Sequence, residues 1–589
     1  MTPRRGLKAR RRQSTSQGSD RLRYLTIGVS IMTILIIGRM FYLQIPKHPF
    51  YEALAESQHA LQQEIAPERG KIYAQNFAEP GKLIPLASNR TYWLLYAVPD
   101  DIENVSEAAD QLLDVLPNLD REEVVSKLSK PNDLYEEIAT KVSEEAYKKM
   151  SEKTIKGIYF TDERIRYYPE KNIGSHMLGF VGFGGGDEKI GQYGLEGGLQ
   201  DVLAGTKGYV KADRDAGGRW IVVGTREFQD AKDGLSLELT IDETIQYTAC
   251  TKLNAAVQKH GADSGSVIIL NPKTGAILAM CGSPDFDPNA YNQVEDIGVY
   301  TNQVTSGAYE PGSIFKSITM AMAVNEEKVT PQTTYNDEGF VKINSYTIEN
   351  SDKKAHGIQT MTQVLEGSLN TGAIFAMQQI GTEKFRDYVK DFGFGATTGS
   401  PIQGESTGNI SNLDLPGEIY AMTGSFGQGI SVTPLQMVSA YGVLANNGKL
   451  MKPYLIAKTL NPDGSTNEET QPEAIRQVIK SETATIIGAM LVNVVENGHG
   501  KKASVPGYYI AGKTGTAQVT STNGRGYDPN NTIGSFAGFG PVSDPAFVML
   551  VRIDHPRDVT FAESTAAPLF GDIAKFLLHY LHISPDRVE

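Results

Sequence analysis

The sequence predicts an α+β protein with three successive parts: an N-terminal transmembrane helix, a mixed α+β domain, and a larger domain in which an antiparallel sheet is flanked by helices. Three observations lead to this fold class. An apolar segment follows a basic N-terminal tail. From Asp233 onwards, strand patterns alternate with helix patterns. A strand and an amphipathic helix end the chain, so helices near both ends of the larger domain can cover central strands.

Residues 1–23 form a basic tail and residues 24–45 an apolar segment. The tail carries eight Arg or Lys and one Asp, a net charge of +7, while the whole chain carries −13. The acidic remainder argues against a nucleic-acid partner. As a helix, residues 24–45 would be about 33 Å long, enough to cross a bilayer. The positive-inside rule then places the tail in the cytoplasm and everything after residue 45 outside the cell (inner or plasma) membrane.

Two other interpretations of the apolar segment are less favoured. A cleaved signal peptide needs small residues just after its apolar core, but residues 38–42 are bulky and include Arg39. A buried core helix is disfavoured by the flanking positive charges. We therefore expect an uncleaved, single-pass anchor.

Residues 46–232 read as a mixed α+β pedestal domain. Residues 106–128 and 143–156 have helical periodicity, and residues 92–98 read as a strand. No catalytic set is evident in this part.

Residues 233–589 form the larger domain. Its expected elements are a strand over 235–241 with a helix to His260, a hairpin with strands 266–270 and 276–280, a strand over 547–553, and a helix from Pro568.

Only two cysteines occur, Cys250 and Cys281. We expect two buried thiols, because Cys281 continues an apolar run, although a disulfide between them stays open. No C-x-x-C pair, Cys/His cluster or H-E-x-x-H pattern occurs, so neither a metal site nor another cofactor is expected.

Three short motifs carry the chemistry. Residues 313–316 are S-x-x-K, residues 368–370 are S-x-N, and residues 513–516 are K-T-G-T. Each is weak alone, but all three in this order within one predicted domain are specific. Ser313 is the expected nucleophile, and Lys316, on the same helical face, is its base. Lys316 must be neutral for this role, and burial together with the charge of Lys513 would lower its pKa.

The other motif residues suit a substrate site. Ser368 can relay a proton, and the Asn370 amide can hold Lys316 and a substrate carbonyl. The K-T-G-T segment is expected on a strand bordering the cleft, where Gly515 lets substrate backbone approach. The hydroxyls of Thr514 and Thr516, with the charge of Lys513, suit a substrate carboxylate. The N–H groups of Ser313 and Thr516 would form the oxyanion hole.

The motif set resembles that of the penicillin-binding proteins, and residues 20–585 look like a class B monofunctional peptidoglycan transpeptidase. Further matching stretches are residues 67–72, 194–197, 285–289, 427–434 and 566–568. The resemblance implies a pedestal below a penicillin-binding/β-lactamase-like transpeptidase domain, D-Ala-D-Ala stem peptides as substrate, and inhibition by β-lactams. Water in place of the acceptor amine would give a D,D-carboxypeptidase side activity. Ile314 replaces the usual threonine and is read as a packing residue, and residues 74–76 depart from the family pattern.

Two alternatives stay open from the sequence. A membrane-bound serine β-lactamase shares S-x-x-K and K-T-G, and Glu366 superficially fits a deacylating base. A β-lactam sensor would need a cytoplasmic signalling domain, which the short tail does not supply. Because the chain has no glycan-polymerising motif, we also hypothesise that anchor and pedestal bind a membrane glycan polymerase.

Overall fold

The computed structural model describes residues 17–48, 60–186, 188–213, 226–520 and 526–587. It separates into two compact units, residues 1–67 with 206–232 and residues 68–205 with 233–589. Residues 1–16 of the predicted tail lie outside the described residues.

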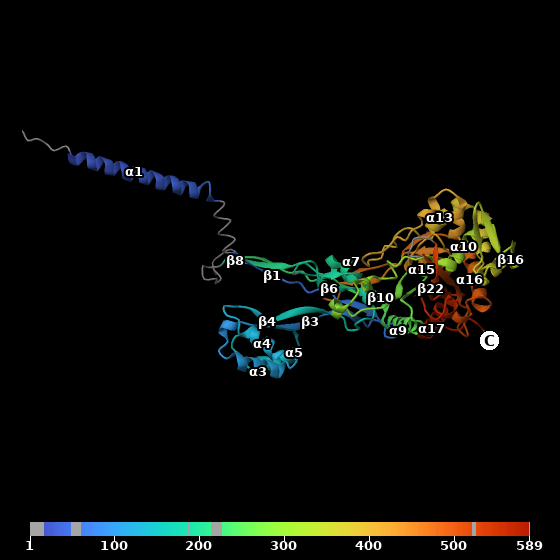
Figure 1. Cartoon of the computed structure of the whole chain (residues 1–589), viewed down its shortest axis with the longest axis horizontal. Coiled ribbons are helices and arrows are strands. Elements are labelled where there is room, and N and C mark those ends of the chain that lie inside the picture. Colours follow the sequence, from blue (N-terminus) through green and yellow to red (C-terminus); the bar gives the residue numbers. More distant parts are fainter. Residues whose placement is uncertain (1–16, 49–59, 187, 214–225, 521–525, 588–589) are drawn as a thin grey trace, which may run out of the picture. The chain divides into compact units, whose positions relative to one another are not determined.

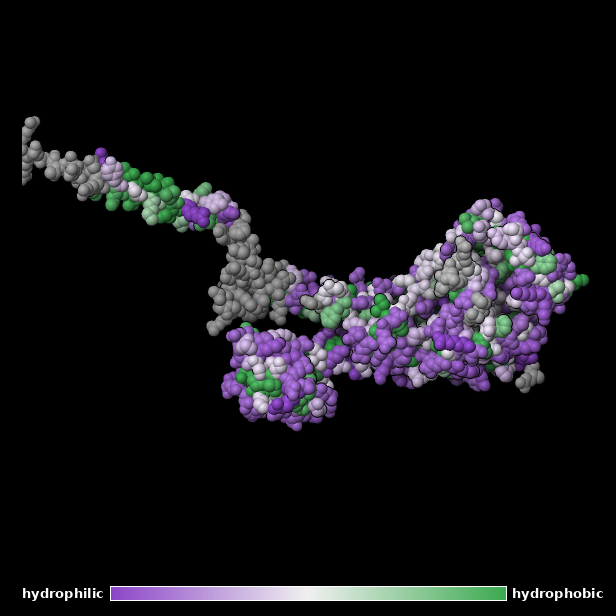
Figure 2. Space-filling view, viewed as in Figure 1, coloured by the Kyte–Doolittle hydropathy of each residue, from purple (hydrophilic) through white to green (hydrophobic). Residues whose placement is uncertain are grey.

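The first unit contains an N-terminal helix and a small sheet. Helix α1 (Gln17–Gln44) includes a 23-residue stretch, Leu22–Gln44, that is long and apolar enough to cross a membrane. Figure 2 shows apolar residues along most of this helix. The helix predicted over 24–45 is confirmed, and it extends from Gln17 to Gln44. Strands β1 (Ala60–Ile65), β8 (Gly208–Asp213) and β9 (Arg226–Gln229) pair antiparallel in the order β1-β8-β9.

In the second unit, the pedestal is built on a seven-stranded sheet. Its order is β19-β18-β10-β2-β3-β4, with β5 also paired to β3. The strands are β2 (Ile72–Gln75), β3 (Ile84–Ala97), β4 (Glu136–Val142), β5 (Ile158–Tyr167), β10 (Ser236–Asp242), β18 (Ile456–Leu460) and β19 (Thr466–Glu469). The predicted strand over 92–98 is the second half of β3. Since β10 pairs with β2, the sheet joins sequence on both sides of residue 233, and the 232/233 boundary stays a prediction.

The helices of the pedestal differ from those expected. The predicted helix 106–128 is two helices, α3 (Val105–Val115) and α4 (Arg121–Leu128). Pro117 lacks an N–H and disfavours a helical residue before it, and the Asp120 side chain caps α4 by accepting from the Glu123 N–H. The predicted helix 143–156 ends early, as α5 (Glu144–Ser151), and Thr154 beyond it has a left-handed backbone (φ +48°).

The C-terminal part of the second unit is built on a five-stranded antiparallel sheet of order β12-β11-β23-β22-β21. Its strands are β11 (Ser264–Leu270), β12 (Ile277–Ser283), β21 (Ala511–Thr520), β22 (Tyr527–Gly540) and β23 (Phe547–Asp554). The predicted hairpin and C-terminal strand are confirmed. Strand β21, which carries K-T-G-T, lies at the sheet edge, as expected.

Helices cover both faces of this sheet, which confirms the predicted architecture. Helices α9 (Glu243–His260) and α17 (Ala566–Tyr580) pack side by side on one face (Figure 1). Leu253, Val551 and Phe570 are among the fully buried residues of that core. Helix α15 (Pro434–Ala445) packs on the other face in a second core, with α10 (Phe315–Asn325) and α16 (Ser481–Glu496) beside it.

Smaller elements complete the second unit. They are α6 (Ser175–Leu178), β6 (Phe180–Phe183), β7 (Lys189–Gln192), α7 (Gly194–Gly198), α8 (Gln200–Leu203), β13 (Thr334–Asp337), β14 (Phe340–Ile343), β15 (Tyr346–Glu349), β16 (Gly357–Thr360), α11 (Met361–Glu366), α12 (Asn370–Ile380), α13 (Thr382–Asp391), α14 (Glu418–Gly424), β17 (Lys449–Met451) and β20 (Ala474–Gln477).

The two cysteines form a disulfide, so the expectation of free thiols was wrong. Cys250 on α9 and Cys281 on β12 have Cα atoms 5.3 Å apart and are joined through their sulfurs. The apolar run around Cys281 correctly indicated burial. The sequence pattern could not show that α9 packs against β12 and brings the second thiol into reach.

Candidate active site

The S-x-x-K motif spans a tight turn and the start of a helix. Ser313 lies in the 3-10 turn η4 (Gly312–Ile314), and Lys316 lies in the first turn of α10. Ser313 is partly exposed, whereas Lys316 is 1% exposed. The expected nucleophile therefore borders solvent, whereas its expected base is buried.

The turn η4 is held against the sheet edge. A Cβ added at Gly515 of β21 would lie 2.9 Å from the Pro311 carbonyl oxygen and 3.1 Å from the Ile314 side chain. A side chain at residue 515 would therefore collide with the chain's own turn. The expected role of Gly515, which is to let substrate backbone approach, stays a prediction. Ile314 is fully buried in the main core, which confirms it as a packing residue.

A buried tyrosine that the motif analysis missed also supports the turn. The hydroxyl of Tyr441 donates to the Ile314 carbonyl at 2.8 Å and lies 3.0 Å from the Ser317 hydroxyl. Its position in the mostly apolar segment 434–445 was the available sequence signal, since a buried tyrosine hydroxyl usually has a partner.

Ser368 joins the two motif lysines. The Lys316 Nζ donates to the Ser368 carbonyl and lies 3.3 Å from the Ser368 hydroxyl, and Lys513 donates to the same hydroxyl at 2.9 Å. Ser368 has a left-handed backbone (φ +55°), which is unfavourable for a residue with a side chain and is common at functional sites. The three motifs thus meet at one serine hydroxyl.

Burial sets the electrostatics of both lysines. Lys316 is held well below its usual pKa by burial and by the positive charge of Lys513. Burial alone lowers the pKa of Lys513 to about 7. In the described part of the chain, no ion pair joins either lysine to a carboxylate. A neutral Lys316 can accept a proton from Ser313, as the predicted base must.

The remaining motif residues have other partners in this structure. The Asn370 amide donates to the Glu349 carbonyl at 2.8 Å, and its described contacts do not include Lys316. The Thr516 hydroxyl accepts from the Ala562 N–H at 3.2 Å, and the Thr514 carbonyl accepts from Lys513 at 3.1 Å. The substrate-binding roles of Asn370, Thr514 and Thr516 stay predictions.

Glu310 is a further acidic side chain beside the motif turn. Its carboxylate accepts from the Gly429 N–H at 3.1 Å and from the Tyr527 hydroxyl at 3.0 Å. Burial raises the pKa of Glu310. The motif analysis assigned it no role, because nothing in the local sequence indicates that residues 427–434 and 527 meet it.

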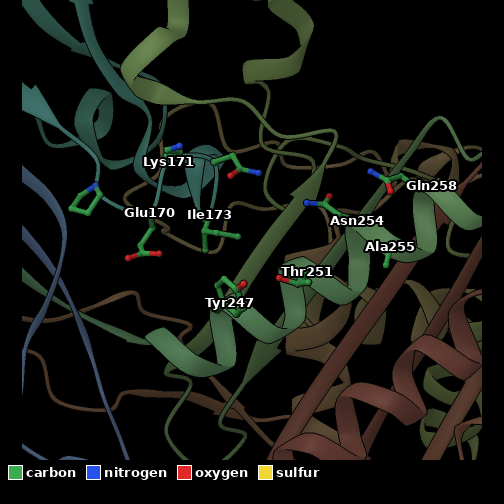
Figure 3. Close-up of a pocket in the computed structure, with 10 residues that line it drawn as sticks. Glu170, Lys171, Ile173, Tyr247, Thr251, Asn254, Ala255 and Gln258 are labelled. Carbon is green, nitrogen blue, oxygen red and sulfur yellow. The ribbon is translucent and has the colours of Figure 1, made fainter.

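A cavity of about 510 Å³ lies elsewhere, between α9 and the loop that precedes α6 (Figure 3). Tyr247, Thr251 and Asn254 line it from the helix, and Glu170 and Lys171 from the loop. It includes no motif residue. Among the described residues, no three His, Cys, Asp or Glu side chains gather as a metal site requires.

Comparisons with known proteins match both parts of the chain. Residues 265–575 match the penicillin binding protein transpeptidase domain, and residues 64–239 match the penicillin-binding protein dimerisation domain. Stage V sporulation protein D of Bacillus subtilis is 35% identical over 96% of this chain and 86% of its own length. A peptidoglycan D,D-transpeptidase FtsI homolog of Mesostigma viride is 31% identical over 94% of both chains.

Solved structures share the fold. Penicillin binding protein 2X of Streptococcus thermophilus superposes with a TM-score of 0.76 at 23% identity, over 89% of this chain and 81% of that one. Penicillin binding protein 3 of Mycobacterium tuberculosis, complexed with aztreonam, gives 0.68 at 26% identity, over 89% and 98%. The fold class predicted from the sequence is confirmed.

Proposed function

This chain belongs to the class B penicillin-binding proteins, and we propose that it cross-links peptidoglycan stem peptides through an ester on Ser313. It is a serine-type D,D-transpeptidase. The observation that carries the residue assignment is the pair of buried lysines that share the Ser368 hydroxyl next to the Ser313 turn.

The proposed acylation begins with neutral Lys316. It takes the Ser313 proton as the hydroxyl oxygen attacks the carbonyl of the penultimate D-Ala. The N–H groups of Ser313 and Thr516 stabilise the oxyanion. The C–N bond then breaks, and Ser368 delivers the proton from Lys316 to the leaving D-Ala amine. In the second half-reaction, an acceptor amine attacks the ester, the ester C–O bond breaks, and the proton of the amine returns to Ser313.

Lys513 and the adjacent threonines supply substrate recognition. The D-Ala donor ends in a carboxylate, and an opposite charge favours the protonated form of Lys513. The Thr514 and Thr516 hydroxyls add donors for that carboxylate, and the Asn370 amide would hold the substrate carbonyl after rotating away from Glu349. A β-lactam reacts at the same serine. Its ring amine stays tethered to the acyl group and obstructs the acceptor.

The persistence of the adduct tests this proposal. Full-length protein in detergent should form one fluorescent-penicillin adduct per chain, on Ser313, that survives for tens of minutes. Lacking a group dedicated to activating water slows hydrolysis by ~10²–10⁴-fold. Ser313→Ala should abolish the adduct, whereas Ser411→Ala, at an exposed serine, should leave it intact. Rapid multiple-turnover hydrolysis would instead revive the β-lactamase alternative and Glu366 as its base; the names of the relatives do not favour it.

Anchoring and orientation are part of the proposal. Apolar helix α1 would hold the chain in the cell membrane, with the basic tail in the cytoplasm and the catalytic domain outside, because positive residues stay on the cytoplasmic side. Reporter fusions to each end in the producing cell test this orientation. A reporter that is active only outside the cytoplasm should work at the C-terminus and not at the N-terminus. The reverse result would contradict the proposed orientation.

Cross-linking requires nascent glycan, and the two domain families that match this chain are a transpeptidase and a dimerisation domain. The anchor and pedestal would therefore bind a membrane glycan polymerase. Photo-cross-linkers placed in α1 and along β3–β5 should capture such a polymerase in cells, while cross-linkers on α17 should not. Equal capture from both sets would argue against this docking surface.

A further inference from the structure

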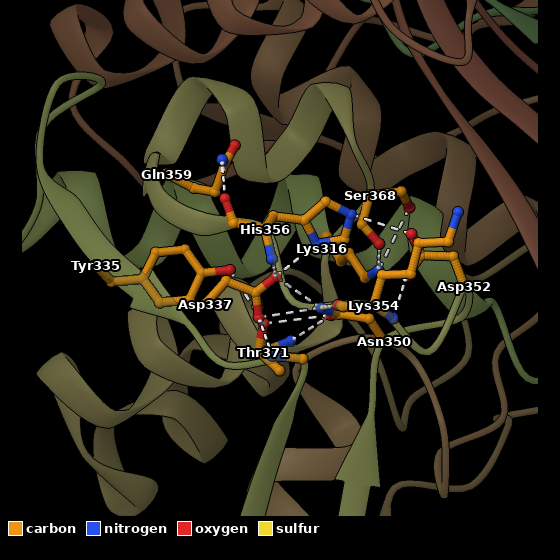
Figure 4. A network of polar contacts seen from close by, with 11 residues as sticks. Lys316, Tyr335, Asp337, Asn350, Asp352, Lys354, His356, Gln359, Ser368 and Thr371 are labelled. Carbon is orange, nitrogen blue, oxygen red and sulfur yellow. Dashed lines mark hydrogen bonds and ion pairs between the residues drawn. The ribbon is translucent and has the colours of Figure 1, made fainter.

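A buried carboxylate lies behind the S-x-N motif. Asp337, at the end of β13, is 1% exposed. Figure 4 shows it at the centre of several polar contacts. Its donors are the Gly339 N–H at 2.9 Å, the Asn350 amide at 2.9 and 3.0 Å, the His356 ring Nδ1 at 2.6 Å, the His356 N–H at 3.2 Å and the Thr371 hydroxyl at 2.8 Å. Burial raises the pKa of Asp337, but these hydrogen bonds hold it below its usual value.

These donors come from segments that only the fold brings together. Asn350 follows β15, His356 precedes β16, and Thr371 lies in the first turn of α12. Tyr335, two residues before Asp337 on β13, adds a hydroxyl 3.0 Å from that of Thr371. The charge of Asp337 therefore ties two small hairpins to the beginning of one helix.

That helix begins at Asn370, the last residue of the S-x-N motif. Thr371 follows Asn370 directly, and both residues are fixed to consecutive residues of the β15 loop. The Thr371 N–H donates to the Asn350 side chain at 3.2 Å, and the Asn370 amide donates to the Glu349 carbonyl at 2.8 Å. The segment directly after Ser368 is thus held through Thr371 and Asn350, both of which donate to Asp337.

Ser368 needs such support. Its backbone has the unfavourable left-handed conformation, and its hydroxyl must meet both Lys316 and Lys513. Strained conformations persist only where the surroundings fix them. Since small displacements of proton-transfer groups cost large factors in rate, the position of this hydroxyl should control acylation.

We propose that Asp337 and Thr371 are positioning residues for the transpeptidase reaction: through the Asn350 loop they hold the S-x-N segment so that the Ser368 hydroxyl bridges the two lysines. This inference rests on the proposed roles of Ser313, Lys316 and Ser368. Asp337 and Thr371 would act on the reaction through Ser368, without contact to the substrate or to Ser313. Their loss should therefore change the acylation rate and not only the stability of the fold.

The test uses full-length protein in detergent and a chromogenic cephalosporin. Stopped-flow acylation over a range of concentrations gives the dissociation constant of the non-covalent complex and the acylation rate constant separately. We expect Thr371→Val to lower the rate constant by about 10–10²-fold, with the dissociation constant within about 3-fold. Thr371→Ser, which keeps the hydroxyl, should restore the rate constant to within about 3-fold.

A matched control is Thr362→Val. The Thr362 hydroxyl donates to the Pro331 carbonyl at 3.2 Å, outside the Asp337 group, so its loss should change the acylation rate constant by less than about 2-fold.

If Thr371→Val fails to fold, Asp337→Asn, which preserves the shape of the side chain, tests the proposal instead. A folded Asp337→Asn variant with a reduced acylation rate constant supports it. A wild-type rate constant in either folded variant overturns it, as does a Thr371→Ser variant as slow as Thr371→Val. In all variants, Ser313 labelling that persists, however slow, shows that the proposed nucleophile still operates.

Discussion

Two buried polar clusters in the second unit differ in the partners of their basic side chains. In the pedestal, Glu196 is fully buried between Arg69 and Arg166, with a carboxylate oxygen 2.7 Å from the Nε atom of each guanidinium. In the active site, Lys316 and Lys513 are equally buried, but they share a serine hydroxyl. The first cluster pairs its charges, and in the described residues the second has no carboxylate partner.

This difference sets the protonation states. Burial would raise the pKa of Glu196, but the two guanidiniums outweigh burial and hold it below its usual value. For Lys316 and Lys513 nothing offsets burial, so both pKa values fall. A buried base with an acid partner stays charged and holds segments together, whereas a buried lysine without one becomes a proton acceptor near neutral pH.

The largest expected effect is on the paired cluster. Glu196→Gln leaves two buried guanidiniums without a counter-charge, which should lower the free energy of unfolding by about 3–5 kcal/mol. Urea unfolding measures this loss. The control, Glu144→Gln, removes the partner of Lys148 in an exposed pair and should lower the free energy of unfolding far less. Similar small losses in both variants would show that the Glu196 cluster adds nothing beyond a surface ion pair.

The next effect is on the unpaired cluster. Lys316→Arg keeps the positive charge but cannot lose a proton near neutral pH, and Lys316→Met has no amine at all. Each should slow acylation of Ser313 by at least ~10²-fold, measured by fluorescent-penicillin labelling. Circular dichroism should show both variants folded. Near-normal labelling of either folded variant would remove Lys316 from the mechanism.

The sequence predicted what depends on local pattern. The hairpin 266–280, helix 243–260 and C-terminal helix each follow from their own periodicity and end signals, and the S-x-x-K spacing placed Ser313 and Lys316 on one turn. The same reasoning failed where a single residue interrupts a pattern. Residues 106–128 have continuous amphipathic spacing, but Pro117 divides them into two helices.

What the sequence could not show depends on tertiary contact. The disulfide between Cys250 and Cys281 requires the packing of α9 on β12. The close approach of the turn at Pro311 to Gly515, which leaves no room for a Cβ, also depends on tertiary packing. The support of S-x-N by Asp337 spans residues 337–371 and has no fixed spacing to search for.

The smallest expected effect concerns the pH dependence of stability, where the two clusters should act in opposite pH ranges. Glu196, with a lowered pKa, contributes stability that is lost only as pH falls below about 4.5. Lys513 has a pKa of about 7 in the folded chain and about 10.4 when unfolded. Between these values the unfolded chain binds one more proton, so raising the pH favours the folded state.

The stability of the wild type should therefore rise between pH 7 and pH 9, with Lys513 contributing at most about 1.4 kcal/mol per pH unit. Lys513→Met removes that contribution and should reduce the slope, whereas Lys452→Met, at an exposed lysine paired with Glu473, should leave the slope unchanged. Urea unfolding at pH 7, 8 and 9 measures all three slopes. Parallel slopes for wild type and Lys513→Met would mean that Lys513 stays protonated throughout. The active-site cluster would then have a counter-charge, and the contrast with the Glu196 cluster would no longer hold.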